Sequence, residues 1–167
     1  MRVKLFSLFT LVALSLSAFA QDEAALLKYG TDKDACEQNL SIYTKIIKGL
    51  IKTVTEETRK TALVDSLMMV YDQRNVYYPG SEARVIGYKG ADMYKYKKGS
   101  TEGLQESYAV LEEAFRLGGN TTSPRVLSTY FVASTKLLNA KILSIEDLLN
   151  LFSDLSSVIS YKEAKLS

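Results

Sequence analysis

The chain has 167 residues, 47% of them hydrophobic and 24% charged, with one cysteine and no histidine. The lack of histidine removes the usual general base and the commonest metal ligand, and it excludes Ser-His and Cys-His catalysis. A single cysteine cannot form an intramolecular disulfide. We therefore expect no cofactor and no catalytic residue, and we predict that the protein is not an enzyme.

The first twenty residues have the pattern of a secretory signal peptide. Two basic residues precede an apolar run at 5–16, and the small-x-small sequence Ala-Phe-Ala ends at Ala20, before Gln21. The run is too short to span roughly 30 Å of hydrocarbon comfortably, and no later segment resembles a membrane helix; an uncleaved anchor is the alternative. We predict cleavage between Ala20 and Gln21 and a mature protein that is periplasmic or associated with the outer membrane.

Removal of the signal peptide leaves a formally neutral protein. The precursor has 21 basic and 19 acidic residues, and Arg2 and Lys4 belong to the signal peptide. The mature chain therefore gives no electrostatic reason to expect nucleic acid as a partner.

Apolar residues recur at spacings of three and four after Thr31, and only two prolines are present, so we predict an all-α protein. The predicted helices span residues 32–53, 56–76, 81–97 and 101–117, followed by one opened by Ser123-Pro124 and one that begins at Ser144. Six helices joined by short turns give three antiparallel pairs, and stacked pairs can bury faces that one pair cannot. The predicted fold is a short right-handed helical-hairpin solenoid at 32–161, between an extension at 21–31 and a frayed end at 162–167.

Several local signals mark the helix ends. Ser81 and Ser123 are predicted N-caps, Ser144 begins a sequence close to a capping box, and Gly118-Gly119 is expected to end a helix in a left-handed conformation.

Two apolar stripes allow predictions about helix packing. Gly87 and Gly90 lie on the stripe of the third helix, where glycine costs about 1 kcal/mol relative to alanine, which indicates that another helix approaches closely. The last helix is the cleanest amphipathic segment, and its stripe consists of Ile145, Leu148, Phe152, Leu155 and Ile159.

Four stretches of the chain carry a family resemblance: KYGTDKDACEQNLSIYTK, DSLMMVYDQRNVYYPG, RVIGYKGADMYKY and VLSTYFVAS. Together they resemble a group of exported tetratricopeptide-like proteins of Bacteroidota, whose biochemical role is undefined. The resemblance covers residues 28–48 and 64–161 and implies export and a helical-repeat fold, but no catalytic or ligand residue. Relatives of this kind have a further helical segment, with another cysteine, where residues 49–60 form a short bridge here. Cys36 therefore lacks that possible partner and is either a buried small residue or a free or intermolecularly bonded thiol.

The run from Tyr94 to Lys98 alternates aromatic and basic residues. Such a run is typical of surfaces that bind polyanions, and it also suits the last turn of a helix, where cations meet the carbonyl end of the dipole. Both interpretations remain open from the sequence.

The predicted solenoid indicates a binding function. Solenoids of this kind present the first helix of each hairpin along a concave surface, so Arg84, Tyr88, Lys95 and Arg125 are candidate partner-binding residues. We expect the partner to be another envelope protein or a peptide. The alternative is an anionic envelope glycan or a lipid head group. The aromatic pair Tyr77-Tyr78 could either cover the junction between hairpins or face a partner.

Overall fold

The structure is a computed structural model that describes residues 33–77 and 79–166, with only the backbone described at 33–40 and 77. Several sequence-based predictions lie outside the described residues: the signal peptide with its cleavage site at Ala20 and Gln21, the extension at 21–31, the side chain of Cys36, and the rings of Tyr77 and Tyr78.

The chain divides into two units, residues 1–42 and 43–167. The described part of the first unit is the beginning of helix α2, and the second unit contains the end of α2 and all the later helices. The described residues form six α-helices, one short 3-10 turn and no strand: α2 (Lys33–Thr53), α3 (Glu57–Tyr77), α4 (Glu82–Lys97), α5 (Thr101–Gly118), η1 (Gly119–Thr121), α6 (Pro124–Asn139) and α7 (Ile145–Ala164). The all-α prediction is confirmed, and α7 runs to Ala164 rather than stopping before Lys162.

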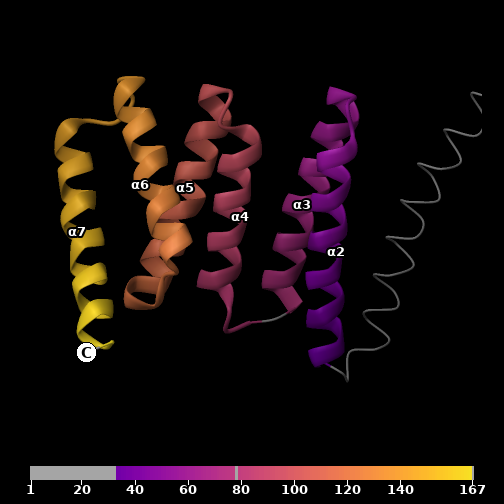
Figure 1. Cartoon of the computed structure of the whole chain (residues 1–167), viewed down its shortest axis with the longest axis horizontal. Helices are drawn as coiled ribbons and strands as arrows, with labels where there is room; N and C mark the ends of the chain where they lie inside the picture. Colours follow the sequence, from indigo (N-terminus) through magenta and orange to yellow (C-terminus); the bar gives the residue numbers. More distant parts are fainter. Residues whose placement is uncertain (1–32, 78, 167) are drawn as a thin grey trace, which may run out of the picture. The chain divides into compact units, whose positions relative to one another are not determined.

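Consecutive hairpins pack against one another. Helix α4 packs on α5, α6 packs on both α4 and α5, and α7 packs on α6, as can be followed in Figure 1. Helix α3 contacts α4, and Lys48 of α2 donates a hydrogen bond to the Tyr71 hydroxyl of α3 at 2.9 Å. We call α2, α4 and α6 the first helices and α3, α5 and α7 the second helices of the three hairpins.

The two glycines of α4 allow the close approach that the sequence predicts. A Cβ atom at Gly87 would lie 2.7 Å from Cγ2 of Val126 in α6, and one at Gly90 would lie 2.8 Å from Cγ of Leu111 in α5. Both distances are shorter than a carbon–carbon contact allows, so neither position has room for a side chain without movement of a neighbour. Helix α4 can therefore contact α5 and α6 at the same time.

The helix ends lie where the sequence signals predict. Ser123 accepts a hydrogen bond from the Val126 N–H, and Gly119 has a positive φ of 45° after α5. Ser144 and Asp147 form a capping box. Ser81 is the N-cap residue of α4, as predicted, but its side chain makes no capping hydrogen bond.

Glu82 supplies the polar contact at the start of α4. Its carboxylate accepts a hydrogen bond from the Gly80 N–H at 2.8 Å, and this contact holds the pKa of Glu82 below its usual value. A turn residue is thus fixed by a side chain inside the first turn of the helix.

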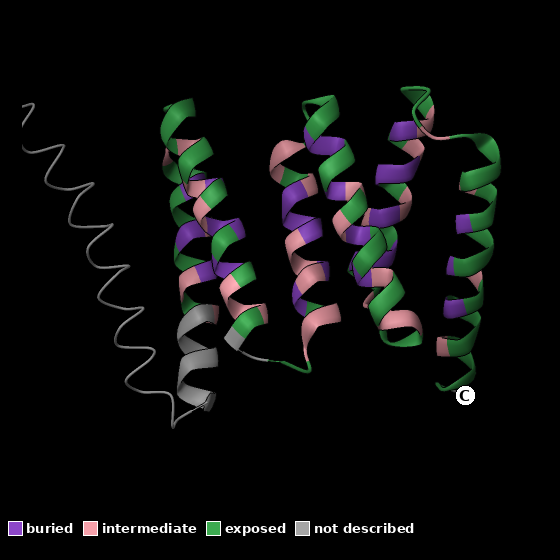
Figure 2. Ribbon diagram, turned by 180° about the vertical axis from the view of Figure 1, so that it is seen from behind, coloured by how far each residue is buried: buried purple, intermediate pink, exposed green. Residues whose placement is uncertain are grey.

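The predicted apolar stripe of α7 is only partly buried. Its buried row is Leu151, Leu155 and Val158, and of the predicted stripe only Leu155 belongs to it. Phe152 and Ile159 are 57% and 47% exposed. The apolar arc of α7 is wider than the surface that α6 covers, and Figure 2 shows the buried residues of α7 on the side toward α6.

None of the described helices combines the length and the apolar content that a membrane-spanning helix requires.

Candidate binding surfaces

A buried carboxylate, Asp92 of α4, accepts contacts from three other helices. Its side chain is 3% exposed. The Tyr71 hydroxyl of α3 donates a hydrogen bond to Oδ2 at 2.6 Å, and Nη2 of Arg125 in α6 donates one to Oδ1 at 2.7 Å. Lys48 of α2 forms an ion pair with the same carboxylate. We call these four residues the Asp92 network.

The network compensates a charge that would otherwise be costly to bury. Removing a carboxylate from water costs several kcal/mol unless close cations and hydrogen-bond donors replace the water. Burial, with a smaller contribution from the hydrogen bond to Asp92, raises the pKa of Tyr71, so the hydroxyl stays protonated and acts as a donor. Sequence reasoning missed Asp92, because a single aspartate inside an amphipathic helix has no distinguishing local pattern.

The Asp92 network also shows that the first helices are neighbours. Lys48 and Arg125 reach one carboxylate of α4 from α2 and α6 respectively. Both cations keep contact with solvent, since their side chains are 29% and 51% exposed. The surface beside Asp92 is therefore formed by all three first helices.

The four candidate partner-binding residues lie near this surface. Arg84, Tyr88 and Lys95 follow one another at helical spacing along α4, and Tyr88 and Lys95 lie four residues before and three residues after Asp92. Arg84 and Lys95 are exposed and Tyr88 is half-buried. Arg125 has a structural contact as well, because its guanidinium is bound to Asp92.

Three further exposed cations of the first helices lie at helical spacing from Lys48 and Arg125 and were not singled out from the sequence. Lys45 and Lys52 lie three residues before and four residues after Lys48 in α2, and Lys136 lies three turns after Arg125 in α6. All three are exposed. The basic face is the set Lys45, Lys52, Arg84, Tyr88, Lys95, Arg125 and Lys136. The sequence pattern that could have revealed these residues is the helical spacing of cations in α2, α4 and α6, considered together rather than one helix at a time.

The Tyr-Lys run at the end of α4 makes contacts within the chain. Lys97 lies 3.6 Å from Asp65 of α3 and 3.5 Å from Glu106 of α5. The Tyr94 ring lies beneath the amino group of Lys136, with 5.7 Å between the nitrogen and the ring centroid. These contacts join neighbouring helices and favour the structural interpretation of the run.

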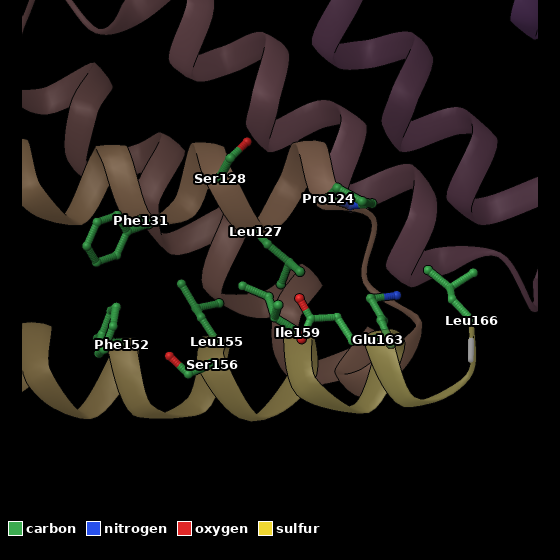
Figure 3. Close-up of a pocket in the computed structure, with 11 residues that line it drawn as sticks. Pro124, Leu127, Ser128, Phe131, Phe152, Leu155, Ser156, Ile159, Glu163 and Leu166 are labelled. Atoms are coloured by element: carbon green, nitrogen blue, oxygen red, sulfur yellow. The ribbon is translucent and has the colours of Figure 1, made fainter.

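An apolar groove runs between α6 and α7 (Figure 3). Its volume is about 420 Å³. The Phe131 and Phe152 rings face each other across it, with centroids 6.1 Å apart. We call it the α6/α7 groove; its lining is Pro124, Leu127, Ser128, Phe131, Phe152, Leu155, Ser156, Ile159, Lys162, Glu163 and Leu166.

A second groove, of about 780 Å³, separates the second helices α5 and α7 and is acidic. Glu112, Asp147 and Asp154 are among its lining residues. Tyr108 and Tyr130 each donate a hydrogen bond to Glu112, and burial raises the pKa of both hydroxyls. The acidic side chains thus gather on the second helices, whereas the basic face lies on the first.

No protein-family model, no curated protein and no solved structure matches this chain.

Proposed function

We propose that this chain is an exported helical-repeat protein that is not an enzyme and that binds another protein in the cell envelope. Export is supported by the signal-peptide pattern of residues 1–20. A binding role is supported by the fold, because stacked helical hairpins offer extended surfaces for partners. The resemblance to exported tetratricopeptide-like proteins of Bacteroidota points in the same direction.

The α6/α7 groove is the observation that carries this proposal. The preceding hairpin, α4 with α5, is covered by α6, which packs on both of its helices. The hairpin of α6 and α7 presents a comparable surface, and no other described helix covers its groove. We infer that the groove accepts an amphipathic helix of a partner protein, seated as α6 is seated on α4 and α5.

The dimensions and the chemistry of the groove suit a helix. From Phe152 to Glu163 the lining of α7 extends about 17 Å, at 1.5 Å per residue, which is about two thirds of the length of α6. The aromatic and aliphatic side chains offer few hydrogen-bond partners for a glycan. Each apolar side chain that a partner helix buries there would contribute roughly 1.5–3 kcal/mol.

A peptide with the sequence of α6 (Pro124–Asn139) is the direct probe, because α6 fills the equivalent position on the preceding hairpin. The peptide is labelled with fluorescein, and its binding to the full chain is measured by fluorescence anisotropy. The variant Phe152→Asp with Ile159→Asp should weaken binding at least tenfold, since each carboxylate would have to be buried in apolar surroundings. The control Ser153→Asp with Ser160→Asp adds the same charge at exposed positions of α7 and should bind as the native chain does.

Native envelope extracts extend the test to natural partners. A protein retained by the native chain and by the control, but not by the groove variant, is the expected result. The proposal is overturned if the peptide fails to bind the native chain, or if the groove variant retains the peptide and the same envelope proteins as the control.

A further inference from the structure

Charge is divided between the two sets of helices. Among the described side chains, the first helices have nine basic and two acidic residues: Lys45, Lys48, Lys52, Arg84, Lys89, Lys95, Lys97, Arg125 and Lys136 against Glu82 and Asp92. The second helices have five basic and eleven acidic residues: Arg59, Lys60, Arg74, Arg116 and Lys162 against Glu57, Asp65, Asp72, Glu102, Glu106, Glu112, Glu113, Glu146, Asp147, Asp154 and Glu163. The net charge of the chain is therefore small, although basic residues predominate on the described first helices and acidic residues on the second helices.

We propose that the basic face binds an extended acidic segment of a partner protein. This inference rests on the proposed function, because it names the chemistry of a protein partner. It concerns a different surface from the α6/α7 groove, so binding at either surface can be present without the other.

The described first helices offer few carboxylates to repel such a segment. Of the two acidic residues on the described first helices, Asp92 is buried beneath the face and already bound to Lys48 and Arg125. Glu82 lies in the first turn of α4 and is bound to the Gly80 N–H. An acidic partner would therefore meet cations from all three helices and, on the described first helices, one solvent-accessible carboxylate, Glu82, at the beginning of α4.

The spacing of the cations suits an extended chain. Packed helices lie roughly 8–10 Å apart. A polyproline II chain is extended, has three residues per turn and advances roughly 3.1 Å per residue, so carboxylates three residues apart point to the same side and would reach successive first helices. A segment with an acidic residue at every third position could contact α2, α4 and α6 in turn.

The Asp92 network holds part of the face in place before a partner arrives. Asp92 binds Nη2 of Arg125, and the guanidinium has five N–H donors, while about half of the side chain remains exposed. A cation that is already fixed loses less conformational entropy on binding. Arg125 is therefore a positioned donor, while Lys95 and Lys136 supply flexible charges around it.

Other side chains between the cations favour a peptide over a polyanionic glycan. Tyr88 lies between Arg84 and Lys95 along α4, and the 44% exposed Val132 lies between Arg125 and Lys136 along α6. A polyanion gains most from a continuous row of cations. Alternation of charge with apolar and aromatic groups instead suits a peptide that has side chains of both kinds.

The test uses the full chain and a fluorescein-labelled peptide of repeating Glu-Ser-Ala units. Binding is measured by anisotropy at low and at physiological salt. The native chain should bind the peptide, and salt should weaken the binding because the contacts are exposed ion pairs. A matched Lys-Ser-Ala peptide should bind far more weakly.

Two variants with the same net charge separate the basic face from bulk electrostatics. Arg84→Gln with Lys95→Gln and Lys136→Gln should weaken binding about tenfold or more, as expected when three exposed ion pairs are lost. Arg59→Gln with Lys60→Gln and Arg116→Gln removes the same charge from the second helices and should leave binding within about twofold of the native value. Circular dichroism melting confirms that both variants are folded.

Three results would overturn the inference: equal binding by the two variants, equal binding of the Lys-Ser-Ala peptide, or binding of heparin at this face without binding of the acidic peptide. The α6 peptide is measured on the same proteins. Its continued binding when the acidic peptide fails would leave the proposed function standing, and the reverse result would overturn the proposed binding at the α6/α7 groove and leave the basic face as the binding surface.

Discussion

Arg125 of α6 donates a hydrogen bond at 2.7 Å to Asp92 of α4 and so joins the first helices of two consecutive hairpins. The same carboxylate accepts a hydrogen bond from Tyr71 of α3 and pairs with Lys48 of α2. Neighbouring hairpins of a helical-repeat protein are held mainly by apolar contacts between adjacent repeats. Here a single buried carboxylate adds a contact among four helices, so its removal should destabilise the packing between hairpins as well as the packing within its own hairpin.

Replacement of Asp92 by alanine should lower the free energy of unfolding by about 2–4 kcal/mol, because two cations and a buried hydroxyl lose their acceptor. Asp72→Ala is the matched control. Asp72 also pairs with a lysine, Lys89, at 2.6 Å, but its side chain is 57% exposed, so its removal should cost about 1 kcal/mol or less. Urea denaturation followed by circular dichroism measures both, and equal losses would contradict a special role for Asp92.

Gly90→Ala should destabilise the protein by about 1–3 kcal/mol, despite the higher helix propensity of alanine, because the new Cβ would lie 2.8 Å from Cγ of Leu111. Gly49→Ala is the opposite case, since no atom lies within 4 Å of a Cβ at that helical position. It should stabilise by about 0.5–1 kcal/mol. Thermal melting distinguishes the two, and stabilisation by both substitutions would show that α4 and α5 are less closely packed.

Leu155→Ala and Phe152→Ala should separate the buried row of α7 from its exposed arc. Leu155 is 5% exposed, and its truncation should cost about 2–4 kcal/mol. Phe152 is 57% exposed, so the loss of its larger side chain should cost about 1 kcal/mol or less. A larger loss for Phe152 in urea denaturation would contradict this assignment, because it would place Phe152 rather than Leu155 in the buried row of α7.

The capping box of α7 should make stability depend on pH in the acid range. Hydrogen bonds from the Ser144 side chain and backbone lower the pKa of Asp147 from its ordinary value of 3.8. A carboxyl group whose folded pKa is depressed stabilises the fold above its unfolded pKa, and this contribution disappears as the pH falls through the folded pKa. Asp147→Asn should therefore destabilise the protein at neutral pH.

The difference between Asp147→Asn and the native chain should shrink as the pH falls through the folded pKa of Asp147, because the protonated carboxyl group is then neutral, as asparagine is. Asp154→Asn removes the same charge about two turns further along α7, away from the cap, and should show a smaller effect at neutral pH. Urea denaturation at neutral pH and at acid pH measures the free energy of unfolding of the native chain and of both variants. A constant difference across the acid range would argue that the Asp147 charge has no part in the cap.

Much of the fold is present in local sequence patterns. The helices begin and end within a few residues of where apolar periodicity and capping residues predict, because both signals act over one or two turns. The close approach at Gly87 and Gly90 was also predictable, since a helix does not keep two glycines on one face without a packing reason. The grouping of Arg84, Tyr88 and Lys95 follows from helical spacing alone.

Other features depend on which helices meet. The sequence by itself determined an all-α chain of hairpins, a small formal net charge of +2 and the candidate stripe on α4, because periodicity, capping and side-chain charge are local properties. Only the tertiary structure decided that Asp92 is buried against Lys48, Tyr71 and Arg125, which come from three other helices, and that part of the apolar arc of α7 stays exposed. The reason is physical: burial and charge pairing are set by neighbours distant in the chain, and helical periodicity does not specify which neighbour covers a given face.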